Sequence, residues 1–149
     1  MKQMMRRYSF MLALTFILSA CTANQTTKIG ATQDRLSPCP PSPNCVSSLS
    51  EDESHYVEPL SYKIQQKEAR EKLISIMNSM KRAKIVTAET DYIHVIFKSS
   101  LFGFVDDVEF MFDDQRKVIE VKSASRTGYW DLGVNRKRVV EIRQRFMQP

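Results

Sequence analysis

The chain has 149 residues and carries 22 Lys and Arg against 17 Asp and Glu, a formal net charge of +5. Three of the cations (Lys2, Arg6 and Arg7) lie near the N-terminus, and without them the remaining 19 exceed the 17 acids by only two. This small excess gives no support to a nucleic-acid partner, and we expect none. Once the N-terminal segments are set aside, roughly 110 residues remain, enough for one domain with one core.

The first twenty residues are typical of an export signal. A basic start is followed by an uninterrupted apolar run over residues 10–18 and then by Leu18-Ser19-Ala20-Cys21. The run is too short to span a bilayer permanently, which takes about twenty residues. The last four residues resemble the lipobox of bacterial lipoproteins, which implies cleavage after residue 20 and a diacylated, N-acylated Cys21. The alternative is an uncleaved anchor helix.

Several acyl chains on Cys21 would form a durable membrane tether, because each buried methylene contributes about 0.8 kcal/mol. In a Gram-negative envelope, Thr22 rather than Asp after the lipidated cysteine favours the outer membrane, with the domain facing the periplasm. Residues 21–37 are polar and show no apolar period, so we expect them to be a flexible tether that leads to a domain over residues 38–149.

The two remaining cysteines, Cys39 and Cys45, lie in the sequence CPPSPNC. Its three prolines and Asn favour a tight turn, and an oxidising compartment favours a disulfide between them. The alternative, a metal site, lacks further ligands nearby. We expect the disulfide to stiffen the loop that leads into the domain.

The hydrophobic periodicity predicts an α+β domain. Apolar residues at spacings of three and four predict helices over 66–80 and 135–146, whereas alternation predicts strands over 84–89, 92–99, 104–113 and 117–125. A further short strand over 55–62 would be confined to an edge by Pro59. We therefore expect an antiparallel four- or five-stranded meander sheet, packed on one face by an N-terminal and a C-terminal helix and exposed on the other.

Two details follow from this pattern. Glu120 and Lys122 are expected to point away from the core. Asn135 is the expected N-cap of the last helix, and the cations that follow it are unfavourable at the positive end of the helix dipole, so a carboxylate or a bound anion should relieve them.

Three blocks of the sequence resemble the domain of unknown function 1499 family. They are CPPSPNCVSS at 39–48, LFGFVDDVEFMF at 101–112 and SASRTGYWDLGVNRKRVVEIR at 123–143. The resemblance covers about residues 36–147. It implies domain boundaries but no activity, cofactor or catalytic residue, since the family has none established.

The turn between the last strand and the last helix is the main candidate site. A strand-to-helix turn can bring arginines and a helix N-terminus together, which favours anionic ligands. The predicted anion or ligand cluster contains Ser123, Ser125, Arg126, Asn135, Arg136 and Arg138. The competing interpretation is a structural charge network in which Arg126 and Arg136 pair with Asp106, Asp107 or Asp131.

Other chemistry has weaker support. Asp106, Asp107 and Glu109 could form a carboxylate cluster, but strand alternation separates Asp106 from the other two, and Glu109 is expected to pair across strands with Lys122. Neither histidine, His55 or His94, lies beside a nucleophile motif. We therefore predict no catalytic residue, metal or cofactor.

Tyr129 and Trp130 have two interpretations: an exposed aromatic platform, or a plug that closes the sheet against the last helix, which we favour. The sequence as a whole predicts a lipid-anchored, non-enzymatic binding or interaction module of the cell envelope. Its expected partners are the membrane, through Cys21, and an envelope protein or an anionic small ligand. The alternatives are an enzyme acting on an anionic envelope substrate, with Arg126 and Arg136 as charge clamps, and a structural assembly factor.

Overall fold

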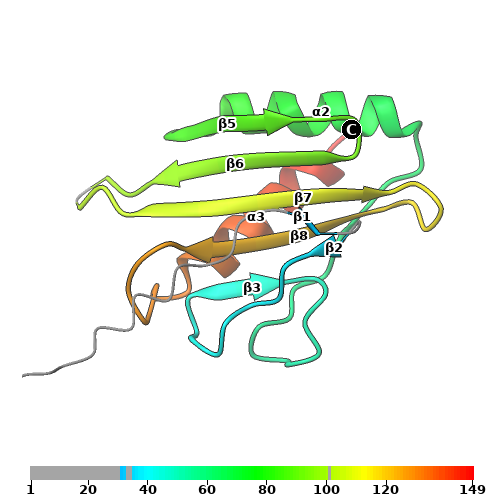
Figure 1. Cartoon of the computed structure of the whole chain (residues 1–149). Coiled ribbons are helices and arrows are strands. Elements are labelled where there is room, and N and C mark those ends of the chain that lie inside the picture. The colour runs from blue at the N-terminus through cyan, green and yellow to red at the C-terminus, as the bar shows by residue number, and fades with distance from the viewer. Residues whose placement is uncertain (1–30, 33–34, 101) are drawn as a thin grey trace, which may run out of the picture.

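A six-stranded antiparallel sheet forms the centre of the computed structural model, which describes residues 31–32, 35–100 and 102–149 (Figure 1). The strand order is β3-β8-β7-β6-β5, with β4 also paired to β8. The strands are β3 (Cys45–Ser47), β4 (Leu60–Ser61), β5 (Ala83–Ala88), β6 (Tyr92–Lys98), β7 (Val105–Asp113) and β8 (Val118–Ser125). The predicted α+β class and the meander of β5 to β8 are confirmed.

Two helices, α2 (Gln66–Ser79) and α3 (Val134–Met147), pack on one face of this sheet. Their apolar stripes meet the alternate strand residues that point towards them, because successive side chains of a strand face opposite ways. The core combines Ala69, Leu73 and Met77 of α2 with Val139, Ile142 and Phe146 of α3 and with strand residues such as Ile93, Val95, Val108, Phe110, Ile119 and Val121.

Two short strands lie one after the other along β8. β3 pairs with β8 through Cys45↔Ala124 to Ser47↔Lys122, whereas β4 pairs further along through Leu60↔Ile119. The short strand expected over 55–62 therefore contains only two residues, which follow Pro59. β3 was not predicted. With β3 and β4 added to the four strands of the meander, the sheet has six strands.

The face of the sheet opposite α3 is not open. A two-stranded hairpin, β1 (Ala31–Thr32) and β2 (Arg35–Leu36), crosses in front of β7 and β8 (Figure 1). Leu36 and Ser37, the last residues of the expected tether, are buried there. Glu120 and Lys122 do lie on this face, as predicted, but they are only 5% and 1% exposed, so the expectation of a solvent-exposed face is wrong over β8.

The expected signal peptide, Cys21 and most of the tether lie outside the described residues. Across the described part of the chain, no helix has both the length and the apolar character needed to cross a membrane.

Candidate functional site

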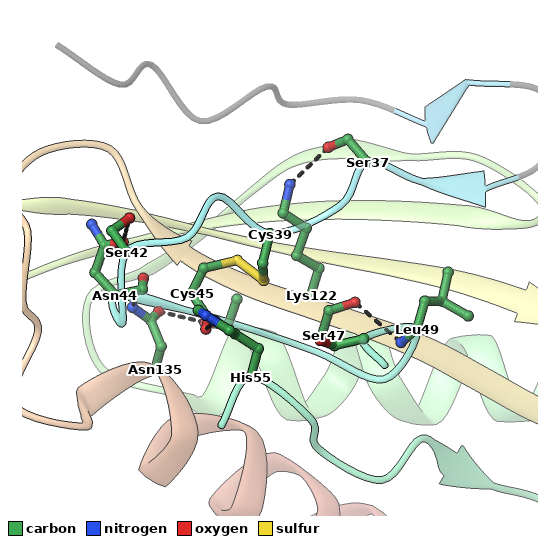
Figure 2. The surroundings of a disulfide bond; sticks show 12 residues. Ser37, Cys39, Ser42, Asn44, Cys45, Ser47, Leu49, His55, Lys122 and Asn135 are labelled. Atoms are coloured by element: carbon green, nitrogen blue, oxygen red, sulfur yellow. Dashed lines mark hydrogen bonds between the residues drawn. A yellow bond between two sulfur atoms is a disulfide. The ribbon is translucent and has the colours of Figure 1, made fainter. Parts of the chain in front are cut away.

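Asn135 is the centre of the predicted cluster, and it is completely buried. Its side-chain oxygen accepts a hydrogen bond from Ser123 Oγ at 2.6 Å. Its amide nitrogen lies near the disulfide loop (Figure 2) and donates to the Asn44 carbonyl at 3.0 Å. It also donates to Ser125 Oγ at 3.0 Å and to Asp131 Oδ2 at 2.8 Å. Asn135 therefore joins the disulfide loop, the end of β8 and the start of α3, and its role is structural.

Arg138 extends this cluster along the helix-covered face of the sheet. Its guanidinium donates to Asn135 Oδ1 at 2.6 Å and to Asp106 Oδ2 at 2.6 Å, and it lies 4.7 Å from the centre of the Phe97 ring. The Arg138 and Asp106 side chains are about nine-tenths buried. Because the guanidinium is held by a carboxylate, an amide oxygen and an aromatic face, Arg138 is fixed in one position.

Arg126 lies on the opposite face, as strand alternation requires for a partner of Asp107. Its Nε and Nη2 donate to the two Asp107 carboxylate oxygens at 2.8 and 2.9 Å, and His94 Nε2 lies 2.7 Å from Oδ1. Burial by itself would raise the pKa of Asp107, but the hydrogen bonds from His94 and Arg126 outweigh it and lower the pKa below its ordinary value. Arg126 is therefore engaged internally, as the network interpretation predicted.

Arg136 pairs with none of the three aspartates, so that part of the network interpretation is wrong. Its guanidinium donates instead to the backbone carbonyls of Ser54 and Tyr56, at 2.7 and 2.6 Å. Arg126 and Arg136 bind different parts of the protein and do not converge on a shared ligand position.

Asp131 caps α3, which begins at Val134 with Gly133 as its N-cap residue, not Asn135 as predicted. The two Asp131 carboxylate oxygens accept hydrogen bonds from the backbone N–H groups of Gly133 and Asn135, at 2.9 and 2.8 Å. A carboxylate at this end of a helix is favourable, since the dipole is positive there. The Asp131 carboxylate therefore offsets the positive charges in the first turn of α3. A carboxylate was one of the two groups expected to do so, the other being a bound anion.

A buried ion pair lies under the β1–β2 hairpin. Lys122 Nζ is 3.7 Å from Glu109 Oε2, which confirms the expected cross-strand pair, and it donates to Ser37 Oγ at 2.7 Å (Figure 2). The Tyr92 hydroxyl donates to the other Glu109 oxygen at 2.6 Å. Burial lowers the pKa of Lys122, and the nearby Glu109 carboxylate opposes that shift.

The predicted disulfide between Cys39 and Cys45 is present (Figure 2). Cys45 is the first residue of β3, and its carbonyl lies 2.7 Å from Nδ1 of the buried His55. The disulfide therefore fixes the Pro-rich loop to the start of β3, which lies beside β8 at the border of the sheet.

Metal chemistry has no structural support in the described ranges: no three His, Cys, Asp or Glu side chains gather there in a way that could hold an ion. Asp106 and Asp107 point to opposite faces and bind Arg138 and Arg126 respectively.

β6 and β8 finish at the same end of the sheet (Figure 1). The segments that follow them carry exposed apolar side chains, and we name this group the apolar loop end. It comes from the β6–β7 loop, the β8–α3 loop and the first residue of α3, and its members are Phe102, Phe104, Tyr129, Trp130, Leu132 and Val134. Tyr129 and Trp130 are 74% and 69% exposed, so the favoured plug interpretation is wrong. Phe102 and Phe104 were missed as candidates, although two aromatics flanking a glycine between strands were a usable signal.

These features define a class of protein: a small α+β domain with an internally satisfied polar junction and an exposed apolar end. Residues 35–146 match the family described as "Protein of unknown function (DUF1499)". The chain belongs to this family. No curated protein and no solved structure matches the chain.

Proposed function

We propose that this protein is a non-enzymatic binding module of the cell envelope, held to the membrane by lipid on Cys21, with its domain in the periplasm. It meets a protein partner through the apolar loop end. The lipobox-like residues 18–21 support the anchor, and the exposed loops support the binding role.

The exposure of the apolar loop end is the observation that carries the binding role. Its six side chains are between 44% and 74% exposed and come from two adjacent loops. Large apolar side chains gathered at one end of a sheet and exposed to water favour an interaction surface, and aromatic residues are enriched at the centres of protein interfaces.

Both loops are held on a firm base, which favours recognition. The Arg126 N–H donates to the Val105 carbonyl at 3.0 Å, and Asn44 Nδ2 donates to the Gly128 carbonyl at 2.6 Å. A surface that is already positioned loses little conformational entropy when it binds.

The enzymatic alternative has less support, because its two charge clamps are occupied. Arg126 is held by Asp107, and Arg136 is held by two backbone carbonyls. Releasing Arg126 for a substrate would take two hydrogen bonds from the buried Asp107 carboxylate.

Site-specific photo-crosslinking in cells tests the binding role. We expect a photoreactive phenylalanine analogue at Trp130, and separately at Phe102, to give the same single protein adduct. The same analogue at the exposed Glu71 on α2 should give none. The double variant Tyr129→Ser/Phe104→Ser should keep its melting temperature and lose the adduct. No adduct at either loop, or an equal adduct at residue 71, would refute the proposal.

A further inference from the structure

A basic groove lies between the two helices and the end of β6. The Arg138–Asp106 pair borders it, whereas the buried Asn135 does not line it. The groove has a volume of about 570 Å³ and is bordered by the C-terminal end of α2, the turn into β5, the loop after β6 and the first half of α3. Sites for small ligands commonly measure about 300–1,000 Å³.

The groove has more cations than acids. Its only carboxylates among the described residues, Asp106 and Glu141, are each already paired with an arginine, Arg138 and Arg145. Four further cations line it, and no salt bridge within the described ranges engages them: Lys81, Arg82, Lys98 and Lys137. Four positive charges are therefore gathered around one depression without a counter-charge.

The floor is rigid and partly apolar. Phe97 is only 6% exposed and has the Arg138 guanidinium stacked on it at 4.7 Å, and Met80 and Val134 lie beside it. Because Arg138 is fixed by Asp106 and Asn135, the floor is formed before any ligand arrives.

A hydroxyl on the rim adds a directional donor. Ser99 borders the groove, and its Oγ accepts a hydrogen bond from the Phe104 N–H at 2.9 Å. Within the described residues its hydroxyl proton has no acceptor, so it can donate to a ligand in the groove. Lysine and arginine with a serine hydroxyl form a donor set suited to phosphate, which presents several acceptor oxygens and at least one negative charge at neutral pH.

From this arrangement we propose that the groove binds a phosphate-bearing ligand, with Lys81, Arg82, Lys98 and Lys137 around the phosphate and the apolar Met80 and Val134 side chains beside its organic part. The phosphate can belong to a free phosphorylated compound or to the headgroup of an anionic lipid. The groove shares Val134 with the apolar loop end, but the proposal rests on the four cations and on neither the protein partner nor the lipid anchor.

Calorimetric titration of the full chain tests the groove with three probes: inorganic pyrophosphate, short-chain phosphatidylglycerol below its micelle concentration, and the zwitterionic phosphatidylcholine of the same chain length. We expect pyrophosphate, phosphatidylglycerol or both to bind, and the affinity to fall as salt rises. Binding of pyrophosphate alone assigns a free phosphorylated ligand, whereas tighter binding of phosphatidylglycerol assigns a lipid headgroup. If phosphatidylcholine binds as tightly as phosphatidylglycerol, the negative charge of the ligand does not determine binding and the proposal is wrong.

Matched variants separate the groove from general charge. Lys81→Gln/Lys98→Gln removes two exposed groove cations and should weaken binding at least tenfold without changing the melting temperature. Lys63→Gln/Lys84→Gln removes two exposed lysines outside the groove and should change affinity less than twofold. If neither anionic probe binds, or if both double variants weaken binding equally, the proposal is wrong. The crosslinking result at Trp130 is unaffected by either outcome.

Discussion

Single residues near the end of β8, on β7 and in the turn that leads to α3, are held in place by charge-assisted hydrogen bonds. Asp107 is the clearest case, since its buried carboxylate accepts two hydrogen bonds from Arg126 and one from His94. Its lowered pKa means that the folded protein favours the ionised carboxylate more than the unfolded chain does.

The pH dependence of stability follows from that direction. The stabilisation from Asp107 is fully present above the ordinary pKa of 3.8 and is lost as the pH falls through the lower folded value. We expect Asp107→Asn to reduce the free energy of unfolding by about 2–3 kcal/mol at pH 7, since a hydrogen bond to a charged group contributes about 1.5–3 kcal/mol. The deficit relative to wild type should shrink at pH 2.5.

Urea unfolding at several pH values measures this difference. Glu71→Gln, on the exposed side of α2, serves as the control and should follow the wild-type curve within about 0.5 kcal/mol. A deficit for Asp107→Asn that stays constant from pH 7 to pH 2.5 would contradict the assignment.

For single residues, the sequence predicted pairs between two side chains better than contacts between a side chain and the backbone. The Glu109–Lys122 pair followed from cross-strand alternation, but the partners of Arg136 are backbone carbonyls in a distant loop. Every residue has a carbonyl, so no sequence pattern marks which one an arginine will bind.

Among the elements, α3 depends on the residues that precede it. It has no acidic residue in its first turn, and the Asp131 side chain supplies the missing acceptor from the turn before it. Two backbone N–H groups and the Asn135 side chain all donate to this one carboxylate.

We therefore expect Asp131→Ala to lower the free energy of unfolding by about 1–2 kcal/mol, the range for loss of a helix N-terminal cap. Glu141→Ala, which removes only an exposed pair with Arg145, should cost less than about 0.5 kcal/mol. Chemical denaturation of both variants provides the comparison. Equal losses would show that Asp131 does not cap the helix.

The long elements were predictable because each has a sustained period, whereas β3 was not. Its three residues are all buried, so they show no alternation, and they follow a Pro-rich loop that reads as irregular. Their pairing with β8 joins residues about eighty positions apart, and such a contact leaves no local signal.

For the whole molecule, the N-terminal hairpin acts as a cover over one face of the sheet. Leu36 is 5% exposed, and Ser37 Oγ accepts the hydrogen bond from the buried Lys122 ammonium. This cover was not predicted, because the segment lies within a stretch that is polar, shows no apolar period and was therefore expected to be a tether. Alternation therefore assigned the opposite face to solvent.

Two shortened chains test the cover. A chain beginning at Pro38 should be less stable than one beginning at Ala31 by about 3 kcal/mol, because it loses a buried leucine side chain and a hydrogen bond to a charged group. Leu36→Ala/Ser37→Ala in the full chain should move stability in the same direction. Identical unfolding curves for the two shortened chains would show that residues 31–37 contribute nothing to the fold.

The form of β5 bears on whether the protein joins with its own copies. β5 is the border of the six-stranded sheet opposite β3 and β4, and a border strand can recruit another chain. The β5–β6 register is interrupted between Ile85 and Thr87, and Arg70 occupies the carbonyls of Ala88 and Glu89. A bulged, partly capped strand is a poor template for strand addition, so we expect no second copy of the chain to extend the sheet at β5, even at high protein concentration.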